Sequence, residues 1–171
     1  AGFTGVACEA VVTQPDGNAT DVTLGQSNFT VTSDLGNDAR RRLRLLAVHL
    51  EHRSERVRVQ TARRVLEMQD GDPLVLAGDF NSSPPGFPLS EVDEAGDSAL
   101  AVFTDAGWRG PPTEAPGQGD LTFPSEAPDR VLDWVLVPPA LEVVEKQVPQ
   151  VTLSDHLPVW TVLEWRGGPC C

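Results

Sequence analysis

The feature that most constrains the fold is an amphipathic segment enclosed by two apolar runs, residues 43–50 and 74–77. Runs this short and apolar are typical of buried strands. Between them Ser54 is a suitable N-cap for a helix that reaches about residue 69. Its apolar side chains recur at roughly helical spacing, at Val57, Ala62, Val65 and Met68. A strand, a helix and a second strand in this order predict a layered α/β domain.

The rest of the chain predicts further strands and one short helix. We expect a helix at residues 98–106 and strands at 131–137, 141–148 and 159–164. Residues 109–119 are rich in Pro and Gly and predict a flexible loop.

The domain organisation follows from where the patterning begins. Residues 1–40 are weakly patterned, with short strands expected only at 6–12 and 29–32. A length of 171 residues corresponds to one domain. We therefore expect one domain over residues 41–167, a poorly patterned segment at 1–40 and a tail at 168–171. No apolar run reaches the roughly 18 residues that a membrane-spanning helix needs.

The three histidines of the chain, His49, His52 and His156, lie in or beside polar clusters at or near the predicted strands. These clusters are residues 48–50, 78–81, 132–134 and 154–156. Such a concentration in a chain with few histidines indicates a site rather than scattered surface positions.

Asp79 and Asn81 follow the second apolar run. Alternation along an extended segment would place both side chains on one face and turn Phe80 into the packing. A carboxylate acceptor and an amide donor would then lie side by side. An ordinary Asp-Phe-Asn turn after a strand is the structural alternative.

Asp133 lies inside the apolar run 131–137. A buried carboxylate costs several kcal/mol unless it is paired or hydrogen-bonded. His156 is the best placed partner, and the pair would fix the imidazole tautomer and raise its pKa. The alternative is a backbone partner at a bulge.

Two further candidates stand at strand ends. Asp155 and His156 are adjacent and point in different directions, so one can bind a metal while the other faces a phosphate. A turn before a strand is the structural alternative. His49 ends its strand, where a structural role is the alternative.

These residue types suit the hydrolysis of a phosphate ester. The reaction needs an activated water, neutralised phosphoryl oxygens and a stabilised leaving oxygen. Carboxylates that hold Mg²⁺ or Mn²⁺ supply much of this, and an imidazole serves as base, acid or donor. The sequence has no Gly-rich nucleotide loop, Gly-x-Ser-x-Gly elbow or Cys/His zinc pattern to suggest another chemistry.

Together the clusters resemble the endonuclease/exonuclease/phosphatase superfamily, the deoxyribonuclease I-like proteins. The specific matches are Gly78-Asp79-Phe80-Asn81 and Ser154-Asp155-His156-Leu157-Pro158, which occur in the family's order. Residues 132–137 are similar to its strand that carries an Asp, and Val48-His49-Leu50 to its Thr-His-Leu segment. The resemblance covers roughly residues 41–165.

The resemblance implies a four-layer α/β sandwich with two mixed sheets covered by helices, and a Mg²⁺ or Mn²⁺ site. It implies that His156 is the general base or contacts the phosphate, and that Asp133 orients it. Asp155 and Asp79 would bind the metal, and Asp79 and Asn81 would position the attacking water and the phosphate. His49 would contact phosphate oxygens.

The N-terminal part departs from the family. Members carry an upstream half with an early Asn and a metal-binding Glu, and only Glu9 in residues 1–40 is a strand-like acidic candidate. We expect the chain to correspond to the C-terminal half of a longer enzyme or to a truncated member. Upstream sequence or a partner would then cover an open sheet face.

Charge bears on the substrate. Thirteen basic and 25 acidic residues give a net charge of −12, whereas nucleic-acid binding usually relies on a positive surface. Arginines do gather at residues 40–44 and 53–64, as a solvated face or as a local rim that attracts phosphate. We therefore expect a small phosphorylated metabolite or a lipid head group, with nucleic acid less favoured. The alternatives are a nuclease of the same fold and a catalytically incomplete fragment that acts as a binding domain.

Overall fold

The computed structural model describes residues 11–12, 23–32, 40–69 and 71–166. Seven strands and two α-helices are present there, together with a short 3₁₀ helix, η1. In chain order they are β1 (Val11–Val12), β2 (Thr23–Thr32), β3 (Arg40–His49), α1 (Glu55–Glu67), β4 (Leu74–Asp79), α2 (Ala99–Asp105), η1 (Gln118–Asp120), β5 (Asp133–Leu136), β6 (Leu141–Gln147) and β7 (Trp160–Trp165).

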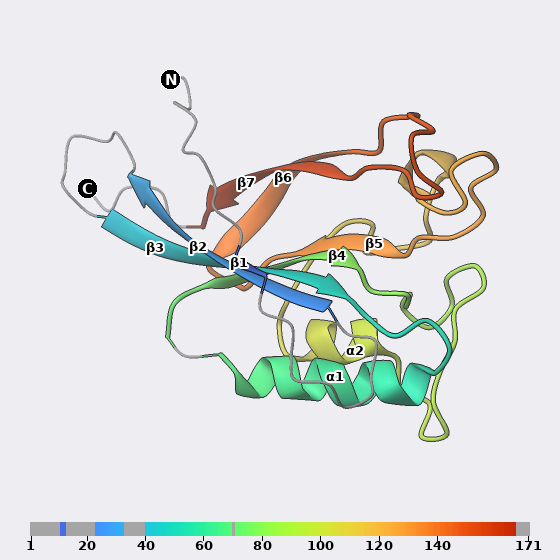
Figure 1. The fold of residues 1–171 in the computed structure, drawn as a ribbon, viewed down its shortest axis with the longest axis horizontal. Coiled ribbons are helices and arrows are strands. Elements are labelled where there is room, and N and C mark those ends of the chain that lie inside the picture. Colours follow the sequence, from blue (N-terminus) through green and yellow to red (C-terminus); the bar gives the residue numbers. More distant parts are fainter. Residues whose placement is uncertain (1–10, 13–22, 33–39, 70, 167–171) are drawn as a thin grey trace.

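Strands β1 to β5 form one sheet in sequence order, and β6 and β7 form a separate antiparallel pair. β3 and β4 are parallel, while β2 and β5 are antiparallel to their neighbours. Helices α1 and α2 cover one face of the five-stranded sheet, and the β6–β7 pair lies over the other (Figure 1). The described residues therefore form helical, sheet and strand-pair layers.

The central strands are buried on both faces. Leu74 and Leu76 belong to the core cluster that contains helix residues such as Val65 and Phe103. Val75, between them in sequence, belongs to a second cluster with Leu141 and neighbours from β7. This is the period of a strand, whose successive side chains point to opposite faces. Burial of apolar area, at roughly 25 cal/mol per Å², thus holds the layers together from both sides.

Most predicted elements are present, with shifted ends. The α/β class of the deoxyribonuclease I-like type is confirmed. Met68, predicted on the apolar stripe of the first helix, is instead 51% exposed because the helix ends at Glu67. The boundary between residues 40 and 41 stays a prediction; β2 pairs with β3 along ten residues. The strand predicted at residues 6–12 and the tail at 168–171 lie largely outside the described residues.

The segment at residues 109–119 differs from the expected flexible loop at its start. Arg109 forms backbone hydrogen bonds in both directions with Val137, of 2.9 and 2.8 Å. Gly110 lies so close to the carbonyl of Val135 that a Cβ would come within 2.4 Å of its oxygen. The glycine is therefore required by a close approach to the sheet. Among the described residues, no helix combines the length and the apolar character needed to cross a membrane.

Candidate functional site

The strand register brings three polar residues into one row. His49 pairs with Asp79 at the ends of β3 and β4, and Asp79 pairs with Asp133 at the start of β5. Hydrogen bonds continue just past these residues, from Leu50 N–H to the Asp79 carbonyl and from Phe80 N–H to the Leu132 carbonyl, both 2.9 Å. The row is therefore held rigidly at one end of the sheet.

Asp79 and Asn81 contact each other as expected, but by a different backbone path. Asn81 donates its backbone N–H to Asp79 Oδ1 at 2.8 Å and its side-chain amide to Oδ2 at 3.1 Å. The same amide contacts the Leu50 carbonyl at 2.9 Å. Asn81 has a positive φ of 47°, so the extended alternation predicted from the sequence is wrong after Asp79. A left-handed turn places the amide there, while Phe80 is fully buried as predicted.

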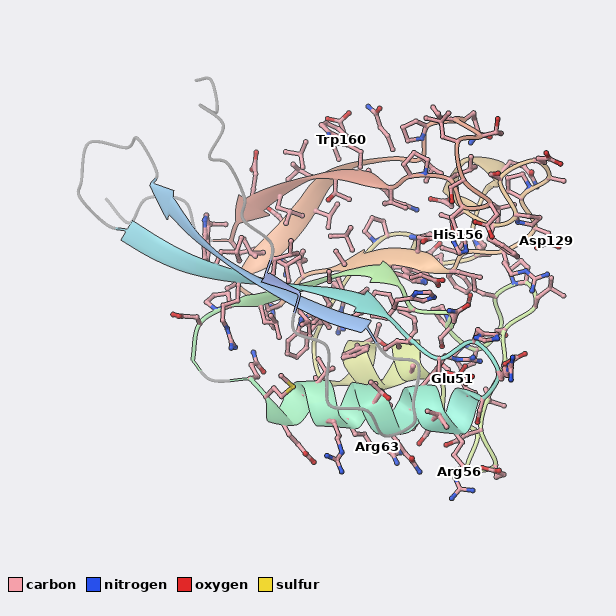
Figure 2. All side chains as sticks on the ribbon, viewed as in Figure 1. Glu51, Arg56, Arg63, Asp129, His156 and Trp160 are labelled. Atoms are coloured by element: carbon pink, nitrogen blue, oxygen red, sulfur yellow. The ribbon has the colours of Figure 1, made fainter. Side chains whose placement is uncertain are left out.

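The pairing expected for Asp133 is present. Nδ1 of His156 lies 2.8 Å from Asp133 Oδ2, and Nε2 of the same ring lies 3.8 Å from Asp79 Oδ2. His49 approaches Asp79 Oδ2 from the neighbouring strand, with its Nε2 at 3.5 Å. Figure 2 shows His156 at the end of the sheet where β4 finishes and β5 begins. One carboxylate, Asp79, thus lies within reach of two imidazoles.

The charges of this cluster shift two titrations. Burial lowers the pKa of His156, but the hydrogen bond that its ring donates to Asp133 and the charges of Asp133, Asp79 and Asp155 outweigh it and raise that pKa above its ordinary value. Burial is the main cause that raises the pKa of Asp79, and the charge of Asp133 adds to it. The Asn81 hydrogen bond and both imidazoles act in the opposite direction. A cation at this point would offset the repulsion between the two carboxylates.

Asp79, Asp133 and His156 could share a metal ion. Each offers a ligand atom, and these atoms lie within 4.8 Å of one another. Two carboxylate oxygens and one imidazole nitrogen suit a divalent cation of the Mg²⁺ or Mn²⁺ kind. The donor set therefore fits the metal implied by the sequence resemblance.

Asp155 and His52 do not belong to this group of three. Asp155 is exposed, and its side chain accepts a hydrogen bond from Ser154 at 3.1 Å. It is absent from the group of three that could hold a metal among the described residues, so its role as a ligand stays a prediction. His52 is exposed and contacts Arg53. Glu9 lies outside the described residues.

Sequence reasoning missed the support given by Thr122 and Phe123. The Thr122 hydroxyl accepts hydrogen bonds from the backbone N–H groups of Leu132 and Asp133, at 3.0 and 3.2 Å. The Phe123 ring packs on the His156 ring with centroids 4.7 Å apart. Leu121-Thr122-Phe123 carries no titratable group, so its only signal was an apolar run interrupted by a hydroxyl.

The chain belongs to the Endonuclease/Exonuclease/phosphatase family, whose sequence profile matches residues 12–156. Members of this family are hydrolases of phosphate esters, generally dependent on divalent metals. None of the curated proteins compared with the chain is a significant match.

Solved structures support the fold. An endonuclease/exonuclease/phosphatase from Bacteroides vulgatus is 23% identical with a TM-score of 0.62, over 85% of this chain and 56% of that one. A mannosyl-6-phosphatase from Bacteroides thetaiotaomicron is 19% identical with a TM-score of 0.56, over 84% and 57%. The human Nocturnin catalytic domain with bound sulfate is 15% identical with a TM-score of 0.57, over 94% and 59%. The chain thus spans little more than half the length of these structures.

Proposed function

We propose that this chain carries the catalytic centre of a Mg²⁺- or Mn²⁺-dependent phosphoric ester hydrolase, a phosphodiesterase or a phosphatase. The observation that supports this most is the convergence of two imidazoles on Asp79, with one of them, His156, held by Asp133 at 2.8 Å. Residues from four separate segments of the chain meet there, as a site for phosphate chemistry requires.

His156 is the proposed general base or phosphate-contacting imidazole. When Nδ1 donates its proton to Asp133, Nε2 is the nitrogen that can take a proton from an attacking water or donate to a phosphoryl oxygen. Asp133 acts as its orienting partner. The raised pKa of His156 keeps a larger protonated fraction near neutral pH, which favours contact with an anionic substrate.

Asp79 is the residue that we propose holds the metal, with Asp155 as a further ligand predicted from the sequence. A bound Mg²⁺ or Mn²⁺ supplies positive charge that neutralises phosphoryl oxygens and lowers the pKa of water. Asn81, whose amide contacts Asp79, positions the water and the phosphate. His49 is exposed beside Asp79 and contacts phosphate oxygens.

A small phosphorylated metabolite or a lipid head group is the proposed substrate. The net charge of −12 disfavours long nucleic acids. One structural neighbour is described as a mannosyl-6-phosphatase, which acts on a compound of this class. A nuclease of the same fold is the enzymatic alternative. A catalytically incomplete binding domain is the other alternative, because the chain spans only 56% of a neighbour of this family.

The test is hydrolysis of bis(p-nitrophenyl) phosphate and p-nitrophenyl phosphate by the full-length protein with Mn²⁺, against the same protein in EDTA. We expect His156→Ala and Asp79→Ala each to lower kcat by about 10²- to 10⁴-fold, the usual contribution of a general acid–base group. His52→Ala is the matched control, since this exposed histidine lies outside the cluster. Equal rates in the wild type and both site variants would refute the assignment.

A further inference from the structure

An ion pair lies buried beneath the site, between two residues of the first turns of α1. Glu55 is 5% exposed and Arg58 is 1% exposed. We infer that Glu55, acting through Ser82, is a positioning residue that holds Asn81 against Asp79. The inference rests on the function proposed above, because it concerns the same site.

Glu55 joins three elements through its two carboxylate oxygens. Oε1 accepts from the Ser82 hydroxyl at 2.7 Å and from the backbone N–H of Ala99, the first residue of α2, at 2.6 Å. Oε2 accepts from Arg58 Nε at 2.7 Å and lies 2.6 Å from Nη2. The side chain therefore fixes the N-terminal ends of both helices to the segment that follows Asp79.

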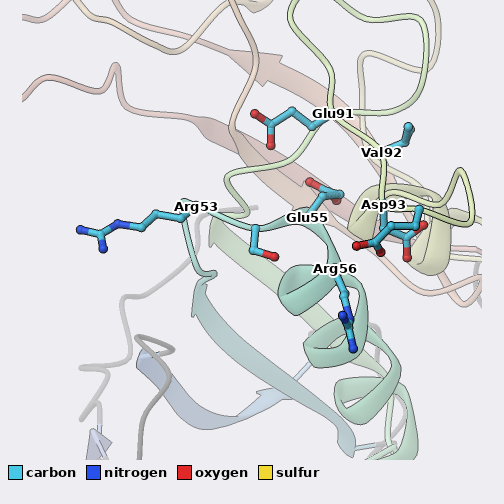
Figure 3. Close-up of a pocket in the computed structure, with 8 residues that line it drawn as sticks. Arg53, Glu55, Arg56, Glu91, Val92 and Asp93 are labelled. Atoms are coloured by element: carbon cyan, nitrogen blue, oxygen red, sulfur yellow. The ribbon is translucent and has the colours of Figure 1, made fainter.

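Arg58 extends this network to the loop after β3. Its Nη1 donates to the Glu51 carbonyl at 2.9 Å, and its Nη2 donates to Glu91 at 2.6 Å. Figure 3 shows Glu55 and Glu91 on the wall of an open pocket at the start of α1. The Glu91 side chain is 64% exposed, so its pair contributes little. Of the two carboxylates that pair with Arg58, the buried one of Glu55 is therefore the one that holds the network in place.

Asn81 belongs to one of the two loops that this ion pair holds, and it contacts the other. Its amide reaches the Leu50 carbonyl on one side and Asp79 on the other. Its backbone occupies the left-handed region at a φ of 47°, which Asn adopts more readily than other non-glycine residues. The position of its amide therefore depends on how the residues around the turn are held.

The residues after Asn81 supply that constraint. Ser82 is held by Glu55 through its hydroxyl, and by the Trp134 indole N–H, which donates to its carbonyl at 3.1 Å. The Ser83 hydroxyl donates to the Val131 carbonyl at 2.6 Å. A buried ion pair is weak evidence for stability in itself. The contacts of the Glu55–Arg58 pair indicate instead that it anchors the turn that carries Asn81.

Ser82→Ala is the test, because Glu55→Gln would leave Arg58 without its buried counter-ion and could prevent folding. In the full-length protein with Mn²⁺ and bis(p-nitrophenyl) phosphate, we expect kcat to fall about 10- to 100-fold, as for a misplaced catalytic group. KM should change little. Ser82→Thr, which keeps the hydroxyl, should restore most of the rate.

The matched control is Trp108→Phe. It also removes one buried hydrogen bond, from Trp108 Nε1 to the Leu74 carbonyl at 2.9 Å, but at the opposite end of β4. If it lowers the melting temperature as much as Ser82→Ala and leaves kcat unchanged, general destabilisation is excluded as the cause. Equal losses of kcat in the two variants would overturn the inference.

A double-mutant cycle with Asn81→Ala tests the route of the effect. If Ser82 acts through Asn81, Ser82→Ala causes no further loss in the Asn81→Ala background; multiplicative losses would overturn the inference while leaving the proposed function intact. The side-chain amide resonances of Asn81 in ¹H–¹⁵N spectra provide a readout without activity. They should shift in Ser82→Ala and not in Trp108→Phe. Because this readout needs no catalysis, an inactive wild type would refute the proposed function but not the inference about Ser82.

Discussion

At the scale of single residues, the site places two carboxylates close together, with imidazoles beside them that reduce their repulsion. Asp79 and Asp133 face each other across paired strands, and each lies near His156. The charge of Asp133 raises the pKa of Asp79 and both carboxylates raise the pKa of His156. The same cluster that would bind a cation is therefore also sensitive to protons.

Asp133→Asn should lower the pKa of His156 in the metal-free protein. The substitution removes the charge and weakens the hydrogen bond that raise this pKa, while burial, the largest single cause, continues to lower it. Titration of the His156 Cε1 resonance in EDTA measures the change. An unchanged pKa in Asp133→Asn would show that the pair is absent in solution.

The same pair predicts a pH dependence of stability. The folded-state pKa of His156 is raised, so its contribution is fully present below the unfolded value of about 6.5. The contribution is lost as the pH rises through the folded-state pKa. Urea denaturation should therefore show a larger cost of Asp133→Asn on the acid side of this window than on the alkaline side. A cost that grows with pH would contradict the assignment.

At the scale of elements, the site depends on the close approach of β3 and β4. Gly78 has a φ of 138°, and a Cβ there would lie 2.0 Å from the carbonyl oxygen of Val48. Val48 and Gly78 are register partners next to His49 and Asp79. Only glycine allows the two strands to stay paired up to the residues of the site.

Gly78→Ala should destabilise the protein by more than about 2 kcal/mol and should lower Mn²⁺ affinity, because the strands must separate next to Asp79. Gly96→Ala is the control for backbone strain alone, since Gly96 has a φ of 87° and open space around a Cβ. Chemical denaturation and calorimetric metal titration measure the two effects. Equal costs at both positions would show that the close approach is unimportant.

At the scale of the whole molecule, the positions of the charged residues bear on the proposed small substrate. Arginines of α1 that could form a phosphate-attracting rim are partly used elsewhere: Arg58 is buried with Glu55, and Arg63 pairs with Asp97. Figure 2 shows Arg56 and Arg63 on the side of α1 away from the sheet. The structure thus favours a solvated helix face for these residues.

The protein should bind duplex DNA weakly, with no salt-dependent retention near 0.15 M, about physiological ionic strength. Fluorescence anisotropy of a labelled duplex across a salt series measures this, with hydrolysis of bis(p-nitrophenyl) phosphate in the same buffers as the control. Tight binding with a steep salt slope would favour the nuclease alternative.

The β6–β7 pair has an outer face on which upstream sequence or a partner is expected to pack. Trp160 and Val144 are 49% and 47% exposed. Figure 2 shows Trp160 on the side of the β6–β7 pair that faces away from the five-stranded sheet. Further sequence or a partner over this face stays a prediction, in keeping with the half-length match to the neighbours.

Local pattern was enough to predict the central elements and two contacts of the site, between Asp79 and Asn81 and between Asp133 and His156. Residues 43–50 and 74–77 were recognisable as buried strands because their side chains pack on both faces, as Leu74, Val75 and Leu76 do. Asp133 was recognisable as paired because an isolated carboxylate inside an apolar strand is costly, and His156 is its partner.

Other features depended on which distant residues the fold brings together. The left-handed turn at Asn81, the Thr122 hydroxyl beneath Asp133 and the hydrogen bond from Ser82 to Glu55 have no periodic signal. Sequence by itself determined the strands, the helix between them and the identity of the polar groups, because burial cost and side-chain period act locally. Tertiary structure decided how the turn after Asp79 and the start of β5 are supported, because Leu50, Glu55 and Thr122 reach them through hydrogen bonds between segments that only packing places in contact.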